Sequence, residues 1–263
     1  MKILQINVTS NWGSTGRIVE DIGNLILGSE GQSYIAYGRD SNPSNSKTIK
    51  VGNKKDIYLH ILQSRLLDRH GLSSNNATKE LINQIKYIKP DIIHLHNIHG
   101  YYLNYKILFE YLSKLDIHII WTLHDCWPFT GHCAYYSYIN CNRWKKECYN
   151  CPQKHKYPIT WIRDRSTKNY RDKKIAFTSV KNMILVPVSN WLAEETRKSF
   201  LNNYPIKVIY NGIDLNTFYP QQPYHSIGDI SLDNKFVILG VASVWDERKG
   251  LSDFIQLRKL LPS

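Results

Sequence analysis

Two spacings of apolar residues alternate along the chain, and each one predicts a different kind of element. Short and nearly continuous apolar runs, typical of buried parallel strands, occupy six ranges: 2–8, 33–37, 91–96, 117–123, 183–188 and 207–210. Apolar residues three or four positions apart predict helices over residues 18–26, 79–88 and 105–115. A further helix follows, which Ser189 or Asn190 can cap. This alternation predicts an α/β fold, a Rossmann-like parallel sheet with helices on both faces.

Polar residues stand at the carboxyl ends of the predicted strands. They fill residues 11–17 after the first strand, 96–99 and 124–125 after two later strands, and 189–190 after another. In an open parallel sheet, ligands bind in the crevice beyond these strand ends. The pattern therefore predicts that the polar groups converge on one edge of the sheet and form a binding site.

The composition changes near the carboxyl terminus. Residues 221–234 are rich in Pro, Ser, His, Gly and Asp, which predicts a linker after a first domain over 1–220. A buried strand is expected over 236–243 and a helix over 251–261. One strand and one helix cannot bury their apolar faces alone, so residues 235–263 are expected to begin a second Rossmann-like domain that is truncated here.

Charge is concentrated in one segment. The chain has 34 basic and 22 acidic residues, a net charge of +12, and residues 143–174 contain eleven Lys or Arg against three acids. Aromatic residues interleave with this charge inside the loop expected over 126–175. Such a loop is either a solvated surface, a contact for anionic lipid head groups or a contact for nucleic acid. No nucleic-acid motif accompanies it, so nucleic acid is not the expected partner.

No stretch approaches the roughly 20 apolar residues of a membrane span, and the first residues are too polar for a signal peptide. We therefore expect a cytoplasmic protein. The basic loop makes the inner face of the plasma membrane a candidate location.

Four of the five cysteines cluster in the basic loop: Cys133, Cys141, Cys148 and Cys151. A Cys-x-x-Cys pair with two further cysteines nearby suits a closed tetrahedral zinc site, which could brace a long loop that has little core of its own. Free thiols, or one or two disulfides, are the alternatives. Cys126 lies outside this cluster; it is expected to be a buried thiol, with a nucleophilic role as the minor alternative.

The order and spacing of the strand-end motifs give a family resemblance. The chain resembles the first half, and a little more, of a retaining GT-B glycosyltransferase of family 4. The motifs that carry the resemblance are Gly13-Ser-Thr-Gly16-Arg17, Asp91-Ile-Ile-His-Leu-His96-Asn97, Thr122-Leu-His124-Asp125, Val188-Ser-Asn190, Ile209-Tyr-Asn211-Gly212-Ile213-Asp214 and Gly240-Val-Ala-Ser243 with Arg248-Lys249-Gly250.

The resemblance implies transfer of a sugar from a UDP- or GDP-linked nucleotide sugar to a glycan or lipid-linked acceptor, in surface polysaccharide synthesis and without a catalytic metal. It makes His124 the catalytic candidate, beside the donor sugar. Hydrogen bonding in a structural role is the alternative for this histidine. The candidate donor-phosphate contacts are Gly13, Ser14, Thr15, Gly16, Arg17, Arg248 and Lys249. A glycine-containing loop that opens a helix lets backbone N–H groups approach phosphate, although a plain strand-to-helix turn has the same sequence.

Candidate acceptor-side contacts follow the later strands: His96, Asn97, His99, Asp125 and Asn190. Packing is the alternative for the first three, and helix capping is the alternative for Asn190. The family's acidic donor motif would lie beyond residue 263, so the chain alone is expected to show no sugar transfer. A non-catalytic module that binds an anionic lipid-linked glycan or a partner is the alternative function. A dinucleotide oxidoreductase is disfavoured, because the full Gly-x-Gly-x-x-Gly pattern is missing.

Overall fold

The computed structural model describes residues 1–222, 224–242 and 244–261. The chain divides into two units, Met1–Gly212 and Ile213–Ser263, and each is described by itself. The domain boundaries expected from composition remain a prediction.

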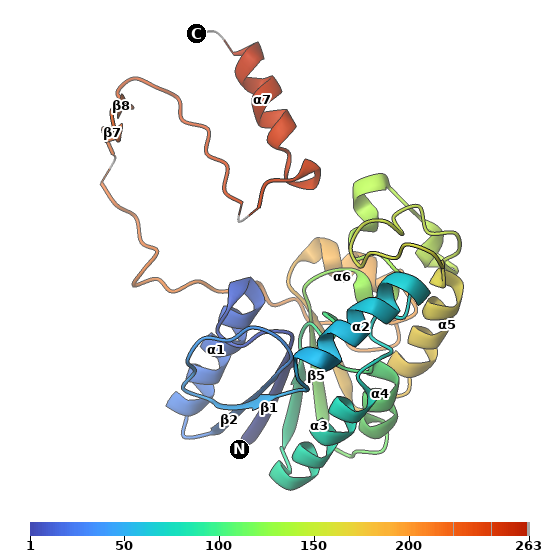
Figure 1. The fold of residues 1–263 in the computed structure, drawn as a ribbon. Coiled ribbons are helices and arrows are strands. Elements are labelled where there is room, and N and C mark those ends of the chain that lie inside the picture. Colours follow the sequence, from blue (N-terminus) through green and yellow to red (C-terminus); the bar gives the residue numbers. More distant parts are fainter. Residues whose placement is uncertain (223, 243, 262–263) are drawn as a thin grey trace. The chain divides into compact units, whose positions relative to one another are not determined.

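The first unit is built on one parallel six-stranded sheet (Figure 1). Its strands are β1 (Lys2–Asn7), β2 (Gln32–Tyr37), β3 (Lys47–Lys50), β4 (Ile92–Leu95), β5 (His118–Leu123) and β6 (Met183–Pro187). Their order across the sheet is β3-β2-β1-β4-β5-β6. The predicted α/β class with a Rossmann-like parallel sheet is confirmed.

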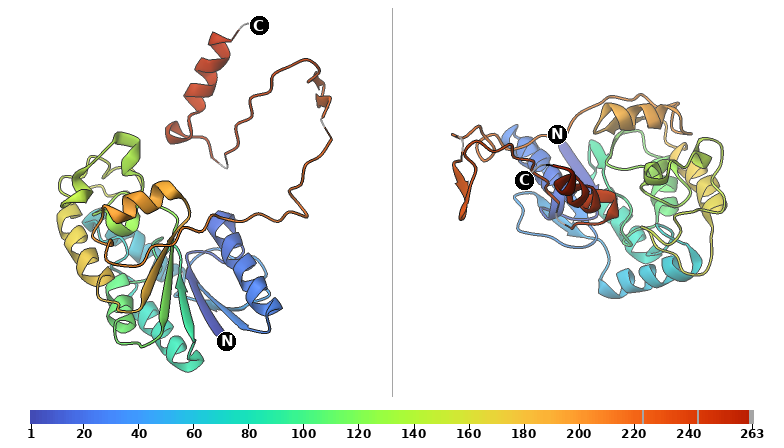
Figure 2. Two further views of the ribbon diagram at one scale, coloured as in Figure 1. Left: turned by 180° about the vertical axis from the view of Figure 1, so that it is seen from behind. Right: turned by 90° about the horizontal axis from the view of Figure 1, so that it is seen from above.

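Six helices belong to this unit: α1 (Gly13–Gly28), α2 (Lys54–Leu67), α3 (Asn75–Ile88), α4 (Tyr105–Leu112), α5 (Ser166–Phe177) and α6 (Asn190–Arg197). The chain moves from β1 to β2 in one direction across the sheet and from β4 to β5 in the other. Because such crossovers are right-handed, α1 and α4 cover opposite faces, as the views of Figure 2 show.

The core lies against the central strands. Leu4 and Ile6 in β1 and Ile93 and Leu95 in β4 have no exposed surface, which explains their continuous apolar runs. An aromatic cluster fills the space between α4, α5 and β5; its members include Phe109, Trp121, Trp127 and Phe177.

Three elements were not expected from the sequence. Both β3 and α2 lie where no element was predicted, and α5 lies in the segment expected to be loop. The apolar residues of α2 do not mark one face, because Tyr58, Leu59 and Leu62 are exposed. Residues 207–210, predicted as a strand, form none; only Ile206 bridges to Leu185, and Lys207 and Ile209 donate backbone hydrogen bonds to β6.

The second unit contains the two-residue strands β7 (Ser226–Ile227) and β8 (Ile230–Ser231), the 3₁₀ turn η4 (Glu247–Lys249) and α7 (Leu251–Leu260). The helix confirms the prediction for 251–261. The buried strand expected over 236–243 is wrong for its described residues, since Phe236 is 93% exposed and Val241 84% exposed. In the described part of this unit the strands are β7 and β8, and these pair with each other. Ser243 lies outside the described residues.

Candidate functional site

The strand order reverses between β1 and β4, and polar side chains gather at the carboxyl ends of these strands. Asn7, the last residue of β1, is fully buried and accepts a hydrogen bond from the Asn97 backbone N–H at 3.2 Å. The Asn7 side-chain amide donates to the Thr9 carbonyl at 2.8 Å. This side chain therefore ties the loop after β1 to the loop after β4.

The predicted phosphate loop forms the N-terminus of α1. Trp12 precedes the helix without a side-chain cap, and the first turn contains no acidic residue. Gly13 has a φ of +66°, and a Cβ at Gly16 would lie 2.7 Å from Thr9 Oγ1. Ser14 and Arg17 are exposed. The first-turn N–H groups are thus available to an anion at a positive helix end.

His96 and His124 meet at the ends of two neighbouring strands. His96 Nδ1 lies 3.2 Å from His124 Nε2, and the two rings are stacked at 5.5 Å. Behind them, His96 Nε2 lies 3.2 Å from Gln5 Oε1, and the Gln5 amide nitrogen donates to the Val19 carbonyl at 2.8 Å. The two residues predicted from separate motifs therefore belong to one hydrogen-bonded chain.

This chain sets the proton positions on both rings. Because the Gln5 nitrogen is used on Val19, Gln5 Oε1 is the acceptor and His96 Nε2 is the donor. In a neutral His96 ring Nδ1 then accepts, so His124 Nε2 carries the proton and donates. His124 Nδ1 is left unprotonated, and within the described residues no hydrogen bond occupies it. The edge of the sheet presents a hydrogen-bond acceptor.

Burial keeps these rings neutral. Removal from water lowers the pKa of His124 to about 4, although the nearby Asp125 carboxylate acts in the opposite direction. Burial likewise lowers the pKa of His94 to about 4 and the pKa of His96 well below its usual value. His94 Nε2 lies 2.8 Å from Thr122 Oγ1, and its ring packs 4.1 Å from that of His96. At neutral pH the strand-end histidines are hydrogen-bonding groups rather than cations.

His99 and Asp125 form a second buried pair. His99 Nε2 lies 2.9 Å from Asp125 Oδ2, and His99 Nδ1 lies 2.9 Å from the Tyr157 hydroxyl. Burial alone would raise the pKa of Asp125, but His99 and the Trp127 backbone N–H lower it on balance. His99 therefore donates to the carboxylate and accepts from Tyr157. Through this chain the basic loop is joined to the residue next to His124.

The remaining predicted contacts belong to other elements of the chain. Asn190 is the exposed first residue of α6, and the capping role falls to Ser189, whose hydroxyl accepts from the Leu192 N–H at 3.1 Å. Arg248 and Lys249 belong to η4 in the second unit.

Several residues of the site were missed from the sequence, notably Gln5, Asn7 and Tyr157. Gln5 and Asn7 have a usable signal in the sequence, because they are polar side chains that alternate with apolar residues of the same strand and are nevertheless buried. Tyr157 has none, since it is one of many aromatic residues in the basic loop.

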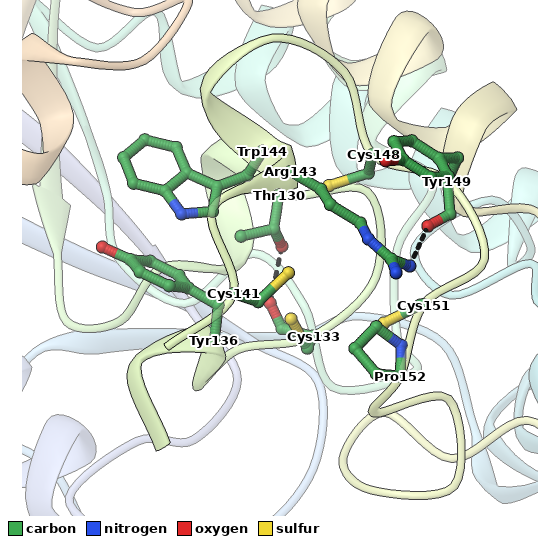
Figure 3. Close-up of a pocket in the computed structure, with 10 residues that line it drawn as sticks. All are labelled: Thr130, Cys133, Tyr136, Cys141, Arg143, Trp144, Cys148, Tyr149, Cys151 and Pro152. Atoms are coloured by element: carbon green, nitrogen blue, oxygen red, sulfur yellow. Dashed lines mark hydrogen bonds between the residues drawn. The ribbon is translucent and has the colours of Figure 1, made fainter. Parts of the chain in front are cut away.

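The four clustered cysteines line one pocket of the basic loop (Figure 3). All are free; Cys133 and Cys148 are buried, while Cys141 and Cys151 are partly exposed. The Cys133 thiol donates to Cys151 and lowers the pKa of that thiol. In the described part of the chain, no group of three or more His, Cys, Asp or Glu is arranged to hold a metal ion. The zinc hypothesis remains a prediction.

Burial raises the pKa of the Cys126 thiol well above its usual value. This cysteine is 3% exposed and lies outside the pocket of the other four. A protonated thiol is a poor nucleophile, so these observations favour the role of a packing residue.

One buried side chain, His132, joins the basic loop to the rest of the unit, and another, Lys173, joins parts of the loop segment 126–175 to each other. His132 Nδ1 lies 2.7 Å from Asp68 Oδ1, and both side chains are almost fully buried. Burial alone would lower the pKa of His132, but its bond to Asp68 raises it on balance. Lys173 Nζ donates to the carbonyl oxygens of Trp127 and Thr130 at 2.7 and 3.0 Å. Burial lowers the pKa of Lys173 to about 7.

A Rossmann-like parallel sheet with polar side chains at its strand ends is typical of the acceptor-side domain of GT-B glycosyltransferases. The profile of Glycosyltransferase Family 4 matches residues 33–217, and the chain belongs to this family. The chain is 27% identical over 232 residues to WcaC of Escherichia coli (strain K12), whose name assigns it provisionally to colanic acid biosynthesis as a glycosyl transferase. That match covers 82% of this chain and 56% of WcaC. The chain therefore spans just over half the length of this relative.

Among the described residues, no helix combines the length and apolarity needed to cross a membrane.

Proposed function

We propose that this chain carries the acceptor-side domain of a retaining glycosyltransferase. The enzyme would move a sugar from a UDP- or GDP-linked donor to a glycan or lipid-linked acceptor in surface polysaccharide synthesis. The observation that carries this proposal is His124, a neutral imidazole with an unprotonated Nδ1 at the carboxyl edge of the sheet. The name of WcaC supports the choice of polysaccharide synthesis.

His124 acts on the sugar through Nδ1. In the transition state the sugar gains positive, oxocarbenium-like character, which a histidine cation would oppose and a neutral ring does not. Nδ1 accepts a hydrogen bond from a hydroxyl of the sugar or the acceptor, while Gln5 and His96 hold the ring orientation. Asn97, His99, Asp125 and Asn190 are assigned to the acceptor side.

Negative charge develops on the departing diphosphate, and cationic or N–H groups must stabilise it. We assign this role to the first-turn N–H groups of α1, from Gly13 to Arg17, and to Arg248 and Lys249 of η4. These groups neutralise the diphosphate in the proposal, which assigns no catalytic metal.

The basic loop suits a lipid-linked acceptor. Eleven Lys or Arg against three acids fall within residues 143–174, and Tyr149 and Trp161 are 53% and 52% exposed there. Basic residues interleaved with exposed aromatic rings favour contact with anionic lipid head groups. We therefore place the protein in the cytoplasm, at the inner face of the plasma membrane, and assign it no nucleic-acid partner.

The test is a sugar-transfer assay on the chain alone and on the chain fused to the donor domain of a family 4 enzyme, with a polyprenyl-diphosphate glycan as acceptor. The fusion is expected to transfer sugar. His124→Ala should reduce the rate roughly 10²-fold or more. The matched control is His118→Ala, an exposed histidine at the opposite end of the same strand, which should leave the rate unchanged. If the acceptor binds but no fusion transfers sugar, the non-catalytic binding module replaces the enzyme.

A further inference from the structure

We propose that Cys133, Cys141, Cys148 and Cys151 bind one zinc ion, which fixes the basic loop in place. This inference does not depend on sugar transfer. All four side chains line the same pocket, and Figure 3 shows them supplied by successive turns of the loop. Four cysteine sulfurs are a ligand set of closed, tetrahedral structural zinc sites. Soft thiolates also select zinc over the hard cations magnesium and calcium.

The backbone around Cys148 is already shaped to support a thiolate. The Gly131 N–H donates to Cys148 Sγ at 3.1 Å. A Cβ at position 131 would lie 2.6 Å from Cys148 Cβ and 2.1 Å from the Ser166 carbonyl oxygen, so only glycine permits this approach. Hydrogen bonds of this kind orient metal ligands and stabilise their charge.

The turn between Cys148 and Cys151 is held from both sides. Arg143 donates to the Tyr149 carbonyl at 2.8 Å and also to the Asn150 carbonyl. On the other side, the Asp164 carboxylate accepts from the Cys151 backbone N–H. Four thiolates around zinc carry a net charge of about −2, and the Arg143 guanidinium beside the pocket offsets part of it.

Closure around the ion requires the sulfurs to move. A formed site places each sulfur about 2.3 Å from zinc, and within the described residues no such arrangement is already present. Cys141 follows the 3₁₀ turn η2 (Tyr136–Ile139), and Cys148 follows the 3₁₀ turn η3 (Arg143–Lys145). Movement of such turns disrupts no strand or α-helix. The partly exposed Cys141 and Cys151 give an ion a way in.

The experiment measures bound metal by elemental analysis of the protein purified without chelators. Wild type should contain about one zinc per chain. Cys148→Ser and Cys151→Ser should each reduce the zinc content at least fivefold. Cys126→Ser is the matched control, because Cys126 is a buried cysteine outside the pocket, and it should retain the zinc. Cobalt added to wild type from which zinc has been removed with a chelator should give the charge-transfer and visible bands of a tetrahedral, all-sulfur site.

The proposal is overturned if wild type holds less than a tenth of an equivalent of zinc both as purified and after incubation with zinc. Stoichiometric iron with the absorption of an iron–sulfur cluster would also overturn it, as would a Cys133–Cys151 disulfide found by thiol counting. If the serine variants fail to fold, the cobalt titration of zinc-free wild type decides the question, and a spectrum without sulfur-to-cobalt charge transfer refutes the site.

Discussion

The strand-end histidines and the cysteine pocket are both buried polar clusters, but the chain builds them in different ways. His96 and His124 follow β4 and β5, so the register of the sheet brings them together. The cysteines lie on a loop whose only regular pieces before α5 are 3₁₀ turns, and this loop is held by single contacts such as His132 to Asp68. Regular backbone pairing positions the first cluster, whereas individual long-range side-chain contacts position the second.

Acid should distinguish the two regions most strongly. The native pKa of His94 and of His124 is about 4, against an ordinary value of 6.5, and that of His96 is also lowered. Between these values the unfolded chain binds protons that the native chain does not. The contribution of these three rings to stability is therefore fully present above pH 6.5 and is lost as the pH drops toward 4. Over this range the three rings together should lower the free energy of unfolding by roughly 4 kcal/mol per pH unit. Urea unfolding at several pH values measures this change.

His132 in the loop should act in the opposite sense. Its native pKa is raised, so its contribution to stability is present below pH 6.5 and is lost as the pH rises through the native value.

The control for the effect of the strand-end histidines is His94→Gln, which retains a partner for Thr122 but cannot be protonated. This variant should flatten the acid side of the profile. A midpoint that does not change between pH 7 and pH 5 would contradict neutral strand-end histidines.

Asp68 holds the basic loop through its contact with His132. Asp68→Asn keeps a residue type that tolerates the φ of 51° at this position, but it removes the charge that partners His132. The free energy of unfolding should fall by about 3 kcal/mol, because a buried ion pair loses one member. Asp116→Asn is the control, since Asp116 is exposed and bonds only Asn182 among the described residues. Equal effects of the two substitutions would refute the role of Asp68.

The third prediction concerns the link between the two regions. Tyr157→Phe removes the hydroxyl that donates to His99 Nδ1 and leaves a buried acceptor unpaired. The expected loss is about 1–2 kcal/mol in urea unfolding. Tyr138→Phe, at a 46% exposed tyrosine of the same loop, should have almost no effect. A neutral result for Tyr157→Phe would mean that the loop does not support His99.

The smallest expected effect is a change in which ring nitrogen of His124 and His96 carries the proton. Nitrogen-15 NMR at neutral pH should show His124 protonated at Nε2 and unprotonated at Nδ1. Gln5→Leu removes the carbonyl that fixes the tautomer of His96 and should give averaged nitrogen shifts for His124. Detection of the opposite His124 tautomer in wild type would refute the derived hydrogen-bond chain.

Periodicity predicted the sheet and most helices because these elements bury long apolar runs. It missed α2, although Asn53 and Asp56 form a capping box there, because the apolar residues of this helix, such as the exposed Tyr58 and Leu59, do not mark one face. The strand-end rule placed His96 and His124 on one edge, and the structure joins them. The partners Gln5 and Asp68 lie 91 and 64 residues from the histidines that they hold, and local sequence patterns carry no information on such pairs.

Asp68 also has a consequence for the order in which the chain folds. It bonds three residues that follow it by 64, 97 and 101 positions, namely His132, Arg165 and Asn169. A ribosome must release all of them before the contacts at Asp68 are complete. Closing such long segments is slow compared with forming β1, α1 and β2. During synthesis the cysteine thiols should therefore stay open to solvent after the first strands have paired.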